Sequence, residues 1–66
     1  MPIIEVTLIE GRPPEKLRTL ITRLTDAAVE AVDAPRESVR VILREVPATH
    51  FAAGDVTVAE RSAGSS

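Results

Sequence analysis

The sequence predicts a small α/β domain, a single β-α-β unit with parallel strands that associates with other copies of itself. Three segments predict this class: alternating apolar residues at 3–9, periodic ones from Pro14 to about Asp33, and a second alternation at 38–46. A strand, a helix and a strand in this order give parallel strands joined by a right-handed crossover. One helix covers only one face of a two-stranded sheet, so the other face requires partner subunits.

The first strand is predicted at residues 3–9, where Ile4, Val6 and Leu8 alternate with polar side chains. The second is predicted at residues 38–46, with Val39, Val41 and Leu43 on one face. A short third strand is expected at Val56-Thr57-Val58, paired with a neighbouring element. We expect one domain over residues 2–60 and a flexible, disordered C-terminal tail over residues 61–66.

The helix is predicted from apolar residues spaced three and four apart, which form one face of an amphipathic helix. These residues are Leu17, Leu20, Ile21, Leu24, Ala28, Ala31 and Val32. The opposite side is expected to be a solvated face, and it carries Glu15, Lys16, Arg18, Thr22, Arg23, Asp26 and Glu30. Pro14 suits the first turn, and Pro35 ends the helix because proline disfavours helical backbone in the preceding residue.

Composition narrows the function classes. A chain of 66 residues is marginally stable alone. With no cysteine it forms no disulfide, and with one histidine it lacks the usual set of zinc ligands. Oligomerisation is therefore the expected support. The net charge of −2 gives no general attraction to nucleic acid. No segment has the length of a membrane span and no leader is present, so the protein is expected to be cytoplasmic.

Pro2 is the first candidate for chemistry. Removal of Met1 is expected because proline is small, and it would leave a secondary amine at the start of the chain. Desolvation and nearby cations lower the pKa of an amine, because both disfavour its protonated form. Such an amine is able to act as a general base near neutral pH. The alternative is that Pro2 only rigidifies the start of a strand.

Two arginines are further candidates. Arg40 lies inside the second predicted strand and Arg12 follows a glycine after the first. Each has a structural interpretation: an ion pair of Arg40 with Glu5 or Glu45, and a solvent-facing loop position for Arg12. Together they have the chemistry to bind a dicarboxylate or to stabilise charge on an enolate oxygen.

These residues together resemble the 4-oxalocrotonate tautomerase family of the tautomerase superfamily. The matching segments are Pro2-Ile3, Leu8-Ile9-Glu10-Gly11-Arg12, Asp33-Ala34-Pro35, Ser38-Val39-Arg40-Val41-Ile42 and His50-Phe51, and the match runs without gaps from Pro2 to about Asp55. The resemblance implies a short C-terminal hairpin after the β-α-β unit. It also implies a homohexamer, built as a trimer of dimers, with active sites shared between subunits and neither metal nor cofactor.

The resemblance also implies the roles of individual residues. Pro2 would be the catalytic base that converts a 2-hydroxydienoate such as 2-hydroxymuconate to its conjugated 2-oxo isomer. Arg12 would hold the distal carboxylate. Arg40, from a neighbouring subunit, would bind the 2-oxo or hydroxyl oxygen and the near carboxylate, and would serve catalysis as well as binding. Phe51 would form an apolar wall around the amine, and His50 is expected to be structural.

Departures from the family pattern keep other functions open. Ala52-Ala53 stand where the typical enzyme of the family has Gly-Ile, and Ala53 offers less apolar bulk to the pocket. One alternative is therefore a different substrate, from a natural-product biosynthetic pathway. A hydratase or dehalogenase-like relative would need a carboxylate just after Phe51, and Asp55 is the nearest acid. A chain that keeps Met1 would be a non-catalytic assembly subunit. A ribbon-helix-helix DNA binder is disfavoured, because it needs a helix where residues 38–46 are strand-like.

Overall fold

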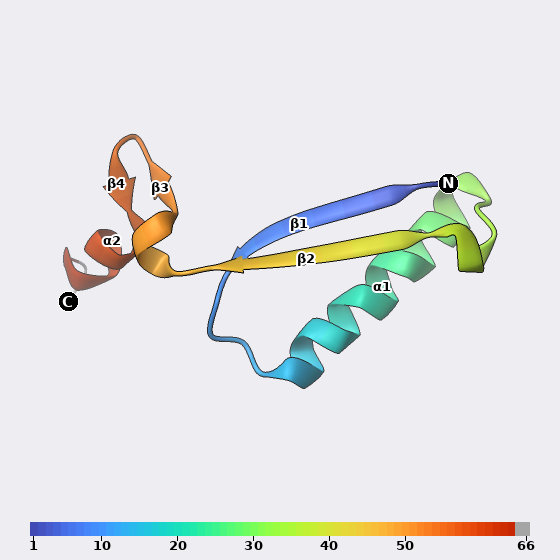
Figure 1. Ribbon diagram of the computed structural model, residues 1–66, viewed down its shortest axis with the longest axis horizontal. Helices are drawn as coiled ribbons and strands as arrows, with labels where there is room; N and C mark the ends of the chain where they lie inside the picture. The colour runs from blue at the N-terminus through green and yellow to red at the C-terminus, as the bar shows by residue number, and fades with distance from the viewer. Residues whose placement is uncertain (65–66) are drawn as a thin grey trace.

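The computed structural model, which describes residues 1–64, consists of a β-α-β body and a small C-terminal arm (Figure 1). The body comprises β1 (Ile3–Ile9), α1 (Pro14–Val32), the 3-10 turn η1 (Arg36–Ser38) and β2 (Arg40–Val46). The arm comprises η2 (Ala48–His50), β3 (Ala52–Ala53), β4 (Val56–Thr57) and α2 (Val58–Gly64). The strands β1 and β2 are parallel, with Ile3 opposite Arg40 and Ile9 opposite Val46. The predicted β-α-β unit is confirmed.

The helix α1 covers one face of this sheet (Figure 1). The side chains of Ile4, Val6 and Leu8 in β1, and of Val41 and Leu43 in β2, are half-buried, as their alternation predicted. Among the described residues, the one buried hydrophobic residue is Ala34, which is 9% exposed, in the connection after α1. The body therefore has a thin apolar layer between helix and sheet rather than a closed core.

The second face of the sheet remains open in the single chain. Ile3 is 59% exposed and Ile42 is 41% exposed, and on the same face Arg44 forms an ion pair with Glu5 at 3.1 Å. The chain is also extended: its radius of gyration is 15.2 Å, against about 11 Å for a compact domain of this length. Both features leave apolar area of this chain available for contact with other subunits.

A charge on the open face should separate the subunits. Replacing Ile42 with Glu would bury an unpaired carboxylate in the interface, which costs about 3–5 kcal/mol. We expect a lower molecular mass by light scattering and a lower melting temperature. Ile42→Val keeps the apolar contact and is the matched control. A fully assembled Ile42→Glu protein of unchanged stability would show that this face is not an interface.

Two boundaries in the body differ from the prediction. β2 begins at Arg40 rather than residue 38, because Ser38 ends η1, where its hydroxyl and its backbone N–H both donate to the carbonyl oxygen of Pro35. The helix ends at Val32, and Asp33 caps it in the left-handed region with a φ of 56°. Val32 is 65% exposed, so the last turn of the predicted apolar stripe lies off the sheet.

The arm is a two-stranded antiparallel hairpin followed by a short helix. Gly54 and Asp55 connect β3 to β4 with φ values of 58° and 66°, the left-handed conformation that a two-residue hairpin loop requires. The hairpin implied by the resemblance is confirmed. Val56 and Thr57 form the expected short strand and pair with Ala53 and Ala52 of the same chain, whereas Val58, predicted to belong to that strand, begins α2.

A capping box starts α2. The Thr57 hydroxyl accepts from the Glu60 N–H at 3.1 Å, and the Glu60 carboxylate accepts from the Thr57 N–H at 2.8 Å. The bond from the Thr57 N–H to the carboxylate, with a smaller contribution from the Thr57 hydroxyl, lowers the pKa of Glu60 below its usual value. Residues 61–64 belong to this helix, which corrects the predicted disordered tail, whereas residues 65–66 of that tail lie outside the described part. Across residues 1–64 no helix combines the length and apolar character of a membrane span.

Candidate active site

Two of the four predicted site residues lie together where β1 and β2 begin. The backbone N–H of Arg40 donates to the carbonyl oxygen of Pro2 at 2.9 Å, which ties the start of the chain to β2. Pro2 is half-buried and Arg40 is exposed. The guanidinium of Arg40 donates to the Glu37 carbonyl oxygen at 2.8 Å, and within residues 1–64 it forms no ion pair with Glu5 or Glu45, so the alternative structural interpretation of Arg40 is wrong. Glu5 instead pairs with Arg44.

Arg12 lies at the opposite end of the sheet, in the loop that follows β1. Gly11 has a φ of +124°, a backbone conformation that L side chains rarely adopt, and it turns the chain from β1 toward α1. The Arg12 guanidinium donates to the carbonyl oxygen of Ile9 at 2.9 Å. The side chain is exposed and pairs with no acidic residue in the described part of the chain. Its charge is free for an anionic ligand.

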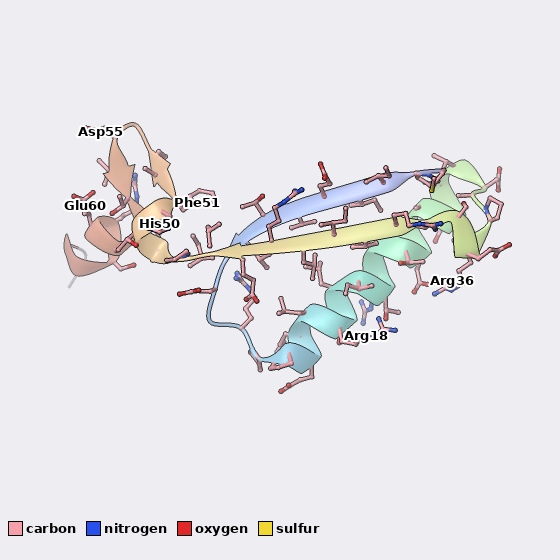
Figure 2. The ribbon with its side chains drawn as sticks, in the orientation of Figure 1. Arg18, Arg36, His50, Phe51, Asp55 and Glu60 are labelled. Carbon is pink, nitrogen blue, oxygen red and sulfur yellow. The ribbon has the colours of Figure 1, made fainter. Side chains whose placement is uncertain are left out.

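Phe51 belongs to the arm, which leaves the sheet at the same end as Arg12. The N–H of Glu10 donates to the carbonyl oxygen of Val46 at 2.9 Å, so the Arg12 loop and the arm start side by side. Phe51 is 39% exposed, and His50 lies beside it at the end of η2 (Figure 2). A large aromatic side chain this exposed on a single chain is available to contact a ligand or a neighbouring subunit.

The four residues therefore form two groups rather than one site. Pro2 and Arg40 lie where the strands begin, and Arg12 and Phe51 lie beyond their far ends. Six residue steps along β1 span about 20 Å. A small substrate held by one group does not reach the other group of the same chain. A site that contains all four residues therefore requires one end of the sheet of one chain to meet the opposite end of the sheet of another chain.

A hollow beside the N-terminal half of α1 extends the Arg12 end. Its volume is about 500 Å³, and it is lined by Arg12, Pro13, Lys16, Leu17, Thr19, Leu20 and Arg23. For Lys16 and Arg23 the helical periodicity predicts only a solvated helix face. Their seven-residue spacing places both on one side of the helix, close to two full turns apart. This spacing is the feature of the sequence that could have predicted that both line the same hollow.

The family model for the tautomerase enzymes matches residues 2–61, almost the whole chain. The chain belongs to the tautomerase family, and it is accordingly an isomerase similar to 4-oxalocrotonate tautomerase. It is 59% identical over 56 residues to a probable tautomerase of Ralstonia nicotianae, covering 85% of this chain and 80% of that one. It is 44% identical over 54 residues to the 2-hydroxymuconate tautomerase of Pseudomonas sp. strain CF600, covering 82% and 86%.

Solved structures of relatives share the fold closely. TomN, a 4-oxalocrotonate tautomerase homologue in the tomaymycin biosynthetic pathway, superposes with a TM-score of 0.95 at 46% identity, covering 98% of this chain and all of that one. A heterohexamer 4-oxalocrotonate tautomerase from Chloroflexus aurantiacus J-10-fl gives a TM-score of 0.87 at 40% identity, covering 91% and 97%. Relatives with this fold therefore include an assembled hexamer and a protein of a biosynthetic pathway.

Proposed function

We propose that the assembled protein ketonises a 2-hydroxydienoate dianion of the 2-hydroxymuconate type, with the amine of Pro2 as general base after removal of Met1. The observation that supports this most directly is the separation of Pro2 from Arg12 and Phe51, which lie at opposite ends of the sheet. Such a separation is what a site shared between subunits requires. The open sheet face supports the sharing of sites between subunits. The 44% identity to a 2-hydroxymuconate tautomerase supports the type of substrate.

The proton transfer needs only groups that this chain carries. The Pro2 nitrogen takes the proton of the enol hydroxyl, whose electron pair forms the C2 carbonyl. The C2–C3 double bond moves to C3–C4, and the C4–C5 electrons take the proton from the Pro2 ammonium at C5. The amine is regenerated, and atoms and charges balance. An amine serves both steps best when its pKa lies near the working pH.

The cations complete the site. Arg12 binds the distal carboxylate, because a guanidinium matches the two oxygens of a carboxylate. Arg40 of a neighbouring subunit binds the C2 oxygen and the near carboxylate, and stabilises negative charge as the enol loses its proton. Phe51 limits water around the amine, and together with the cations it favours the neutral amine. The shared sites belong to a homohexamer, a trimer of dimers.

A biosynthetic substrate is the second candidate. The similarity to TomN supports it, and so does the small size of Ala52 and Ala53 after Phe51. This alternative keeps the same proton transfer and the same base, and it changes only the groups attached to the dienol. Ultraviolet absorbance of 2-hydroxymuconate during ketonisation distinguishes the two, because a biosynthetic enzyme would turn this substrate over slowly or not at all.

Shared sites predict that two inactive variants restore each other. Pro2→Ala and Arg12→Ala chains co-expressed at equal levels should form hexamers in which about one quarter of the sites combine an intact Pro2 with an intact Arg12 from another chain. Ketonisation of 2-hydroxymuconate measures the recovered activity. As a control, the two purified oligomers are mixed without subunit exchange and should stay inactive. Co-assembled hexamers that recover nothing would place Pro2 and Arg12 of each site in one chain.

A further inference from the structure

The hollow beside α1 is larger than the distal carboxylate at Arg12 requires. Its volume of about 500 Å³ is in the range of sites that hold whole small molecules. Because Arg12 lines it, the hollow continues from the point where the distal end of the proposed substrate binds. Space beyond that point is available to a longer substrate.

The charge of the hollow selects for anions. Three of its seven lining residues are cationic and none is acidic. The described ion pairs join Arg36 to Asp26 and Arg44 to Glu5, so Lys16 and Arg23 make none within residues 1–64. Lys16 and Arg23 are seven residues apart on one side of α1, which separates their backbones by about 10 Å.

Apolar side chains lie between these charges. Leu17 and Leu20 line the hollow and are half-buried, with Pro13 and Thr19 completing its wall. The apolar side chains of Leu17 and Leu20 suit the hydrocarbon part of a ligand. The cations Lys16 and Arg23 suit an anionic group at the end of that hydrocarbon chain. A short dianion anchored at Arg12 leaves this apolar surface and the charge of Arg23 unused.

We propose that the hollow is a subsite for an extended substrate, a 2-hydroxydienoate whose second carboxylate is separated from the dienol by more carbons than in 2-hydroxymuconate. Leu17 and Leu20 contact the added methylene groups, and Lys16 and Arg23 bind the terminal carboxylate. The inference rests on the proposed function, because Arg12 belongs to both sites.

Binding of saturated dicarboxylates tests the subsite without turnover. Titration calorimetry of the assembled, Met1-free protein should show affinity rising from adipate to suberate to sebacate, by up to about fourfold for each methylene removed from water. Lys16→Ala and Arg23→Ala should each weaken sebacate about threefold, as for solvent-exposed charges, and leave adipate unchanged. Arg23→Lys should retain the affinity, and added salt should reduce it.

Arg18→Ala is the matched control, because Arg18 is a cation of the same helix that does not line the hollow and hydrogen-bonds Thr22 at 3.2 Å (Figure 2). This variant should bind sebacate like the unmodified protein. If Arg18→Ala weakened sebacate binding as much as Lys16→Ala and Arg23→Ala do, the effect would come from the net charge of the helix, and the proposal would be overturned. Decanoate bound as tightly as sebacate would also overturn it, because the cations would then contribute nothing.

Turnover separates this inference from the proposed function. The longer homologue 2-hydroxydeca-2,4-dienedioate should have a lower KM than 2-hydroxymuconate, and Lys16→Ala and Arg23→Ala should raise that KM about threefold with kcat unchanged. Sebacate binding that depends on Lys16 and Arg23, without ketonisation of either dienoate, would uphold the subsite and overturn the proposed function. Ketonisation of both dienoates without a preference for length would keep the function and overturn the subsite.

Discussion

A chain that keeps Met1 is expected to lose about 10²- to 10⁴-fold in kcat/KM for 2-hydroxymuconate ketonisation, the usual contribution of a general base. Retention of Met1 turns the Pro2 nitrogen into an amide, which does not take a proton at neutral pH. Pro2→Ala should also lose activity, because it replaces the rigid secondary amine with a mobile primary one. Intact-mass spectrometry establishes the first residue of each sample, and stopped-flow absorbance measures the rate.

The pH dependence and the oligomeric state serve as controls for this prediction. Only the unprotonated amine is a base, so kcat/KM should rise with pH until the amine is deprotonated, and the chain that keeps Met1 should not show this rise. Both proteins should have the same mass by light scattering, which excludes a loss through disassembly. Equal activity with and without Met1 would rule out the terminal amine as the base.

Arg40→Ala is expected to reduce kcat about 10²- to 10³-fold, the effect of removing a donor to a developing oxyanion. Arg40→Lys should recover part of this loss, because lysine keeps the charge and loses the paired N–H donors. Steady-state ketonisation of 2-hydroxymuconate separates the effect on kcat from the effect on KM.

Arg44 offers a matched control for Arg40. It lies in the same strand, is exposed like Arg40, and its guanidinium is held by Glu5 at 3.1 Å. Arg44→Ala removes the same charge from β2 and should change kcat less than threefold, in line with the small contribution of an exposed ion pair. If Arg40→Ala and Arg44→Ala reduce kcat equally, the reduction is due to the net charge of the sheet or to assembly. It is then not due to the loss of a donor at the reacting oxygen.

Periodicity alone sufficed for the body of the fold. The alternation in β1 and the spacing of Leu17, Leu20 and Ile21 are set by geometry that does not depend on neighbours. The start of β2 was predicted two residues too early because Ser38 hydrogen-bonds locally, and such bonds compete with strand pairing. The helix at residues 58–64 was missed although Thr57 and Glu60 have the spacing of a capping box.

The site was less accessible to sequence reasoning. Pro2, Arg12, Arg40 and Phe51 were identified by residue type and by resemblance, but their placement at two opposite ends follows from strand register. Arg40 and Arg44 share the face of the sheet on which Glu5 lies, so residue type left either arginine available to Glu5. The pairing of Glu5 with Arg44 depends on which residues face each other across the sheet, which periodicity does not state. Lys16 and Arg23 follow the pattern of ordinary surface charges, and only the folded helix shows that both line one hollow.

The near absence of a buried interior has a consequence for how this protein behaves on dilution. With Ala34 as the one buried hydrophobic residue of the described part, the apolar area that the single chain leaves exposed can leave water only against another chain. Folding and assembly then share one equilibrium, and the melting temperature and the active fraction both depend on protomer concentration. A cell that lowers expression of such a chain lowers its stability together with its amount.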